Sequence, residues 1–277
     1  MSEDLAGRKA QTRAAFNRIA PEYDVAGPGC FAHYGRRLVE VVGVEPGQRV
    51  LDVATGRGAV LVPAAERVGA TGEVIGIDLA EGMVDAANAE VARRGLAAAV
   101  RVMDAERLDF PDASFDRVLC GFGVMFFPDL SRALAEFRRV LKSGGRLGVS
   151  TWRVGQAAEL GAVLAQMGIA GAGGDIAAFQ DPAVVERALV EAGFADVRVR
   201  DDPTVFRYAD IEDYWQTARG TGMRRFIDQL DAAQTERVRA MFGERVRPHS
   251  REDGIYLGAA AILATGSREA GVVRGNE

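Results

Sequence analysis

The sequence contains few of the residues from which disulfide frameworks, metal sites and imidazole bases are built. It holds two cysteines and two histidines among 277 residues. Cys30 and Cys120 lie far apart and form neither a disulfide framework nor a metal-binding motif, so we expect no metal ion. His33 and His249 are the only candidates for an imidazole that exchanges protons with a substrate.

Long apolar runs and excess positive charge are also absent. No apolar run reaches membrane-spanning length and the polar N-terminus does not look like a signal peptide, so we expect a cytoplasmic protein with no membrane span. The net charge of -5 and the pI of about 5.3 argue against nucleic acid as a partner. The other partner predictions, a small-molecule substrate and a monomer or homodimer, do not come from the charge.

A glycine turn between residues 49 and 61 is the most informative pattern that is present. An apolar strand over 49–53 contains Asp52 and runs into a turn with Gly56 and Gly58, after which a helix pattern begins. Glycine is needed where the backbone turns sharply and a ligand approaches closely. The turn therefore predicts a cofactor site, but Leu61 stands where a dinucleotide fingerprint requires its third glycine.

Further strand patterns follow at regular spacing. They cover 73–78, 100–104, 116–122 and 145–152, and helical patterns separate them. The alternation predicts an α/β fold with a buried parallel sheet. Beyond it we expect a helix over 182–192, a strand over 196–200 and a final strand over 256–265.

In this order, the motifs of residues 46–152 resemble class I S-adenosylmethionine-dependent methyltransferases, especially the ubiquinone/menaquinone-biosynthesis C-methyltransferase-like group. The segments that carry the resemblance are 16–24, 50–58, 76–83, 104–116, 126–129 and 134–145. The resemblance implies S-adenosylmethionine as the cofactor, with S-adenosylhomocysteine as its product. It also implies a Rossmann-like sheet, mostly parallel with an antiparallel last strand, flanked by helices.

The same resemblance implies one domain that spans residues 1–277. We expect an N-terminal helical cap over 1–42, a cofactor-binding core over 46–152, a helical lid insertion over 203–250 and a final strand over 254–266. A break in the cap is expected at 27–29, where Gly-Pro-Gly stands. If the lid only covers the substrate, shortening 211–245 should abolish turnover and spare cofactor binding, whereas equal loss of both would show that it is core.

Roles for the acidic residues at the strand ends come from the resemblance. Asp52 would face the methionine end of the cofactor, or would only bond loop amides. Asp78 would accept from the ribose hydroxyls, although it also suits the N-cap of the next helix. Asp104 and Ala105 would contact the adenine. The remaining expected cofactor-binding residues are Tyr23, Ala54, Thr55, Gly56, Gly58, Leu79, Met83 and Gly121.

Three residues depart from the expected pattern of the turn and the helix after it. Ala54 replaces the usual first glycine, and Arg57 stands where a small residue is common. We expect Arg57 to project outward, the alternative being contact with an acidic group of the substrate. Pro63 should kink its helix unless it lies within the first turn.

The expected reaction is in-line methyl transfer to a C, O or N atom of a small, apolar or aromatic metabolite. His33 is the candidate catalytic residue, with packing as its alternative. The candidate substrate residues, each of which could instead pack the lid, are Phe126, Trp152, Trp215, Met223 and His249. A competing function is a cyclisation or rearrangement that keeps the cofactor as a scaffold. Methylated product and demethylated cofactor would appear together only in the first case.

Overall fold

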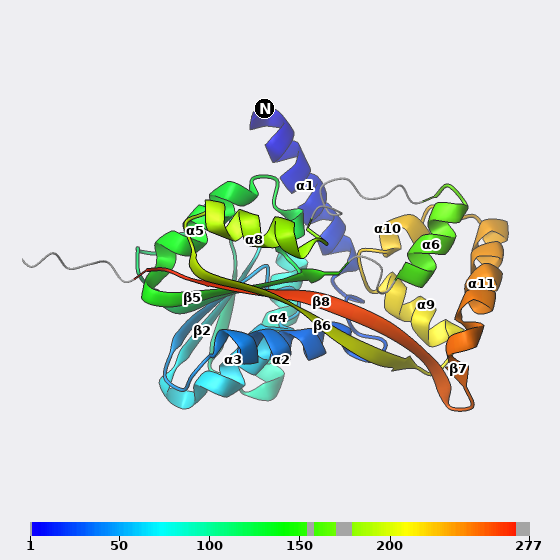
Figure 1. The fold of residues 1–277 in the computed structure, drawn as a ribbon, viewed down its shortest axis with the longest axis horizontal. Coiled ribbons are helices and arrows are strands. Elements are labelled where there is room, and N and C mark those ends of the chain that lie inside the picture. Colours follow the sequence, from blue (N-terminus) through cyan, green and yellow to red (C-terminus); the bar gives the residue numbers. More distant parts are fainter. Residues whose placement is uncertain (1, 154–157, 170–178, 270–277) are drawn as a thin grey trace, which may run out of the picture.

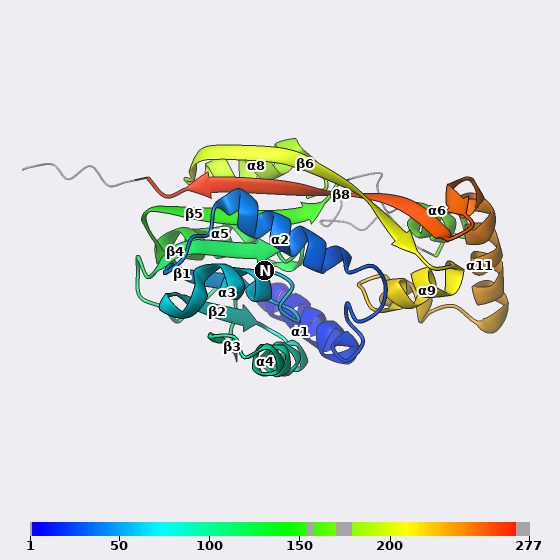
Figure 2. The same cartoon turned by 90° about the horizontal axis from the view of Figure 1, so that it is seen from below.

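A computed structural model describes residues 2–153, 158–169 and 179–269, which form one mixed sheet with helices on both faces (Figures 1 and 2). The strand order is β3-β2-β1-β4-β5-β8-β6, with β7 paired to β8 off this path. The pairs among β3, β2, β1, β4 and β5 are parallel, and β8 is antiparallel to both β5 and β6. This confirms the predicted sheet. The strands are β1 Arg49–Val53, β2 Glu73–Asp78, β3 Ala98–Val102, β4 Phe115–Gly121, β5 Leu141–Trp152, β6 Ala195–Tyr208, β7 Ser250–Arg251 and β8 Gly254–Ser267.

Two apolar cores lie on the two faces of the sheet. Side chains alternate along a strand, so Val50 of β1 joins one core while Leu51 and Val53 join the other. The first core is covered by α2 (Cys30–Val42), α3 (Leu61–Val68) and α4 (Glu81–Arg94), and the second by α5 (Leu130–Val140) and α8 (Pro182–Glu191) (Figure 2). Short 3-10 turns occupy η1 Gly69–Thr71, η2 Val124–Phe126 and η3 Arg247–His249.

The local signals at helix ends act as expected. The side chain of Asp181 caps α8 by accepting from the amide of Ala183, and Pro182 occupies the first turn. Pro63 is the third residue of α3 and so lies within its first turn, where the missing amide costs no helical hydrogen bond. Gly35 in α2 has a different role. A Cβ there would lie 2.0 Å from the carbonyl oxygen of Ala59, so glycine lets α2 pack directly on the turn that follows β1.

The β6 strand is longer than predicted, which moves the start of the lid. It stays paired with β8 from Ala195 to Tyr208, whereas the sequence pattern predicted a strand ending at 200 and a lid starting at 203. Pro203 and the acidic pair before it resemble a turn, but β6 is the edge strand, where proline is tolerated. The lid helices therefore begin after Tyr208, at the end of the long β6–β8 ribbon (Figure 1).

The lid consists of α9 (Ile211–Arg219), α10 (Arg224–Ile227) and α11 (Ala232–Val246), and α6 (Ala158–Gln166) packs against α11. Val238 and Phe242 are fully buried, and Trp215 is 3% exposed. These side chains belong to the same apolar cluster as α2 and β8. The lid therefore has a buried apolar interior, and we predict that shortening 211–245 would expose a large apolar surface and affect more than substrate binding.

The cap is two helices, α1 (Ser2–Ile19) and α2, joined by the turn that contains the predicted Gly-Pro-Gly break. The α1 helix lies beside α4 at the carboxyl ends of the strands (Figure 2). Among the described residues, no helix is long and apolar enough to cross a membrane.

Candidate functional site

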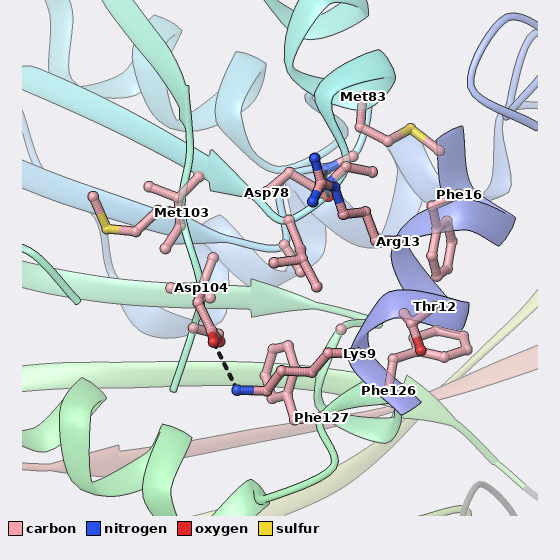
Figure 3. Close-up of a pocket in the computed structure, with 18 of the residues that line it drawn as sticks. Lys9, Thr12, Arg13, Phe16, Asp78, Met83, Met103, Asp104, Phe126 and Phe127 are labelled. Atoms are coloured by element: carbon pink, nitrogen blue, oxygen red, sulfur yellow. Dashed lines mark hydrogen bonds and ion pairs between the residues drawn. The ribbon is translucent and has the colours of Figure 1, made fainter. Parts of the chain in front are cut away.

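A pocket opens at the carboxyl ends of β1, β2 and β4, beneath α1 (Figure 3). This is the edge at which open α/β sheets bind ligands. Nine of the predicted cofactor-binding residues line it: Tyr23, Ala54, Gly56, Asp78, Leu79, Met83, Asp104, Ala105 and Gly121. The predicted substrate residue Phe126 also lines it. Three predicted residues, Asp52, Thr55 and Gly58, are not in the lining.

Asp52 lies under the glycine turn and not at the pocket surface. Its side chain is fully buried, and one carboxylate oxygen accepts from the hydroxyl of Thr55 at 2.6 Å. The other oxygen has no hydrogen-bond partner among the described residues. Burial raises the pKa of Asp52 to about 7. Asp52 and Thr55 thus lie against the turn and outside the pocket lining, and a contact of Asp52 with the cofactor stays a prediction.

Asp78 joins the turn to the end of β2. One carboxylate oxygen accepts from the amide of Gly56 and the other from the amide of Ala80, each at 2.9 Å. The helix that follows begins at Glu81 with Ala80 as its N-cap, so Asp78 is not the N-cap residue. Burial raises its pKa, although the amides of Ala80 and Gly56 oppose that shift. Each oxygen keeps a lone pair, so the carboxylate can still accept from two neighbouring hydroxyl groups.

The far end of the pocket is acidic and is closed by a residue that sequence reasoning missed. Asp104, just beyond β3, accepts from the amide of Glu106 at 2.9 Å. The ammonium of Lys9 lies 2.6 Å from Asp104 Oδ2 (Figure 3). It also lies 2.5 Å from Glu106 Oε2. Lys9 comes from α1, about one-third of the chain before its partners, so no local pattern reports the contact.

The α1 helix supplies a whole wall of the pocket through Lys9, Thr12, Arg13 and Phe16. Arg13 forms an ion pair with Glu81 at the start of α4. Asn17 donates to the same Glu81 at 3.0 Å and accepts from the amide of Gly82 at 2.9 Å. The only sequence signal for this wall is the 16–24 segment that resembles the family, and it does not extend to Lys9 or Arg13.

Arg57 neither projects outward nor reaches into the pocket, which corrects both expectations for it. Its Nη1 donates to the carbonyl oxygen of Ala20 at 2.8 Å, and the Pro21 carbonyl lies 3.5 Å away. These carbonyls follow the last turn of α1, where cations and donors are stabilising. The unusual arginine of the turn therefore anchors the cap.

Aromatic rings continue from the pocket towards the lid. Phe16 and Phe126 meet edge to face at 5.0 Å, and Tyr23 stacks on Phe31 at 5.3 Å. Behind them, Trp152 packs on Phe122 at 4.4 Å. Trp152 is therefore a supporting residue of this aromatic wall and does not line the pocket, whereas Phe122 and Phe127 do.

The other candidate substrate and catalytic residues lie elsewhere. His33, on α2, bonds through Nε2 to the hydroxyl of Thr204 at 3.1 Å and packs edge to face on Tyr34. Trp215 and Met223 pack within the lid, and His249 is exposed in η3. The structure brings none of these four residues to the pocket, because α2 and the lid turn these side chains into their own contacts.

The residues present fit an adenosyl cofactor with a methionine tail. Asp78 and Asp104 stand at the ends of neighbouring strands, and Met83, which is 1% exposed, lies between α4 and the pocket. Gly121 provides backbone at the other end, where a Cβ would lie 2.6 Å from Val60. Two acceptors for ribose hydroxyls, an acceptor for an amine and an apolar surface for a ring match the chemistry of S-adenosylmethionine.

Comparison with known proteins gives the same assignment. Residues 50–145 match the family model "Methyltransferase domain". Nocamycin O-methyltransferase of Saccharothrix syringae is 37% identical over 270 residues, which cover 91% of this chain and 96% of that protein. Aklanonic acid methyltransferase DauC of a Streptomyces species is 46% identical over 140 residues, 50% of this chain and 64% of that protein.

More distant matches cover the core or share only the fold. The ubiquinone/menaquinone biosynthesis C-methyltransferase UbiE of Cupriavidus necator is 35% identical over 148 residues, 52% of this chain and 61% of that protein. The crystal structure of the [4+2]-cyclase SpnF superposes with a TM-score of 0.55 at 23% identity, covering 87% of this chain and 81% of that one. This likeness shows a common fold.

Proposed function

The chain belongs to the S-adenosylmethionine-dependent methyltransferases, and on that premise we propose that it methylates an oxygen atom of a largely apolar small molecule. The observation that carries this proposal is the extent of its similarity to Nocamycin O-methyltransferase, which covers 91% of the chain. The match to UbiE covers 52%. The longer match takes in cap and lid regions that lie outside the cofactor-binding core, and it therefore says more about function than a match to the shared fold does.

The aromatic wall supports an apolar acceptor. Phe16, Phe122, Phe126 and Phe127 line the pocket, and Phe31 and Trp152 extend the rings beyond it. Aromatic surfaces bind planar, carbon-rich molecules through area and through offset or edge-to-face contacts. We therefore infer that an acceptor held in this pocket lies against the aromatic wall.

Within the site, the residues of this chain bind, orient and exclude water. When bound, S-adenosylmethionine supplies a methyl group that its positive sulfur activates. Asp78 would hold the ribose hydroxyls, Asp104 and Ala105 would hold the adenine, and Tyr23 would cover the tail. Alignment of two reactants supplies much of the barrier reduction in such a displacement.

The nucleophile that we propose is an acidic oxygen, which needs no general base. Among the described lining residues there is no histidine, and His33 is 3.1 Å from Thr204 instead. A general base is needed only if the acceptor arrives protonated with a high pKa. We therefore infer that the acceptor is a carboxylate or an acidic hydroxyl group, ionised before it binds.

A matched set of acceptors tests the proposal. Purified protein would be incubated with methyl-labelled S-adenosylmethionine and aromatic acceptors of one skeleton that carry a carboxyl, an acidic hydroxyl, an amine or only a nucleophilic carbon. We expect label in an O-methyl product, with an equal amount of S-adenosylhomocysteine. Label on carbon or nitrogen alone would contradict the proposal.

The cyclase fold neighbour motivates the second candidate, a rearrangement with the cofactor as scaffold. In that case the acceptor would change structure without gaining mass, and no S-adenosylhomocysteine would form. A cytoplasmic location and a monomeric or homodimeric state stay predictions, which cell fractionation and sedimentation would check.

A further inference from the structure

We propose that Lys9 is a cofactor-retaining residue, which closes the adenine end of the pocket by bridging Asp104 and Glu106. The proposal rests on the use of S-adenosylmethionine and not on the identity of the acceptor. It gives α1 a specific chemical task in addition to covering the pocket.

Lys9 occupies an unusual place on its helix. The half-buried positions of α1 follow a helical stripe through Leu5, Lys9, Thr12 and Phe16, while most of the residues between them are exposed. A lysine on the inward stripe is uncommon, because its charge must be compensated there. Its side chain is 24% exposed and reaches into the pocket lining (Figure 3).

The carboxylates of Asp104 and Glu106 form a preorganised binding site for the Lys9 ammonium. Asp104 Oδ1 is held by the amide of Glu106, and Glu106 Oε1 is held by the amide of Asp129, each at 2.9 Å. The other oxygen of each carboxylate faces Lys9. Because backbone amides already fix both carboxylates, these two side chains lose little conformational entropy when the Lys9 ammonium binds between them.

The contact between Lys9 and the two carboxylates differs from an ordinary surface ion pair because one carboxylate is buried. Glu106 is 5% exposed at its side chain, so the pair is screened less than an exposed one. Burial lowers the pKa of Lys9, but Asp104 and Glu106 outweigh that effect and raise it overall. Without the ammonium, two fixed carboxylates would face each other at the pocket edge.

The contact also spans the pocket opening. Arg13 and Asn17 attach α1 to the start of α4 on one side, and Lys9 attaches it to the segment after β3 on the other. The apolar cluster of α1 holds only Ile19 as a buried residue and Phe16 as a half-buried one, both near its C-terminal end. Among the described side chains, the N-terminal half of α1 therefore joins no buried apolar cluster, and loss of Lys9 would weaken its attachment over the adenine end.

The test is the exchange of S-adenosylhomocysteine by Lys9→Met, measured by calorimetry and by stopped-flow displacement. We expect its dissociation rate and its Kd to rise about tenfold, as loss of one partly buried charged contact predicts. Lys9→Arg should stay within about threefold of the wild type because it retains the charge. The only other lysine, Lys142, offers a matched control. It pairs with Asp116 at 2.8 Å near the amino ends of β4 and β5, away from the pocket, so Lys142→Met should leave exchange unchanged.

Two results would overturn the proposal. Tighter binding by Lys9→Met would show that the ammonium competes with the adenine for Asp104, and unchanged exchange would show a surface ion pair with no role in retention. Glu106→Gln provides a second variant should Lys9→Met melt early, since it keeps the acceptor for the Asp129 amide and should also speed dissociation. Failure of the wild type to methylate oxygen would not affect these measurements, so the two proposals fail separately.

Discussion

Arg57, from the glycine turn, donates a hydrogen bond to the carbonyl oxygen of Ala20, at the end of the first helix, over 2.8 Å. The contact crosses from the turn that shapes the cofactor pocket to the cap that covers it. Arg57 departs from the family pattern in the turn, and the cap provides the carbonyl oxygen that accepts its hydrogen bond.

Removal of this contact should loosen the cap without unfolding the sheet. We expect Arg57→Ala to raise the Kd for S-adenosylhomocysteine about tenfold, because a charged hydrogen bond of this kind contributes about 1.5 kcal/mol. Calorimetry would measure it. The control is Arg67→Ala, which removes a similar bond to the carbonyl of Val44 at 3.0 Å away from the pocket. An equal effect of both variants would contradict a specific role for Arg57.

Ala54 carries backbone strain at the pocket. Its φ of 54° lies in the left-handed region, where a Cβ is unfavourable and glycine is not penalised. We expect Ala54→Gly to raise the free energy of unfolding by about 1 kcal/mol, after the entropy gained by the unfolded chain is subtracted. Urea unfolding would show it, and Ala92→Gly inside α4 should lower stability by a similar amount. A destabilised Ala54→Gly would mean that its methyl group makes packing contacts worth more than the strain.

Asp52 should make stability depend on pH in a defined direction. Burial raises its pKa to about 7 from 3.8, so between these values the folded state binds more protons than the unfolded state. The contribution of Asp52 to the free energy of unfolding is present in full below pH 4. It is lost as the pH rises through 7, which lowers the free energy of unfolding by up to about 4 kcal/mol. Asp24, whose pKa burial raises to about 6, adds a loss in the same direction between pH 4 and 6.

Asp52→Asn isolates the first effect, because an amide oxygen still accepts from Thr55 and does not titrate. We expect the variant to gain stability over the wild type between pH 5 and 8 by a few kcal/mol, measured by urea unfolding at each pH. The exposed Asp109→Asn should run parallel to the wild type. A constant difference between Asp52→Asn and the wild type would show that Asp52 is ionised throughout.

Variants of His33 and Phe126 should differ in kcat/KM, because only Phe126 lines the pocket. His33 bonds to Thr204 outside the pocket, so we expect His33→Gln to keep kcat/KM within about threefold and to leave its pH profile unchanged. Phe126 lines the pocket and meets Phe16 at 5.0 Å, so Phe126→Ala should lower kcat/KM about tenfold or more. Loss of the acidic limb, which a general base produces, in the His33→Gln profile would restore the catalytic role predicted for this histidine.

Much of the pocket could be predicted because its residues follow strands. Asp78 ends β2 and Asp104 follows β3, and parallel strands bring their carboxyl ends to one side of the sheet, so the strand pattern together with the family resemblance placed these residues at one site. Asp52 could not be placed in the same way. Asp52 lies inside β1, just before the glycine turn. Only the packing of the folded protein decides whether its side chain faces the ligand or the core.

Local sequence therefore determined the alternating strands and helices, the glycine turn and the cofactor edge, because each depends on residues close together in the chain. Tertiary structure decided which distant side chains complete that edge. Lys9 reaches Asp104 across 95 positions, Arg57 reaches Ala20 across 37, and Pro203 stays in a strand only because β6 lies at the sheet edge. Such contacts depend on how a finished helix or strand lies over the sheet, and no period or motif within either segment encodes them.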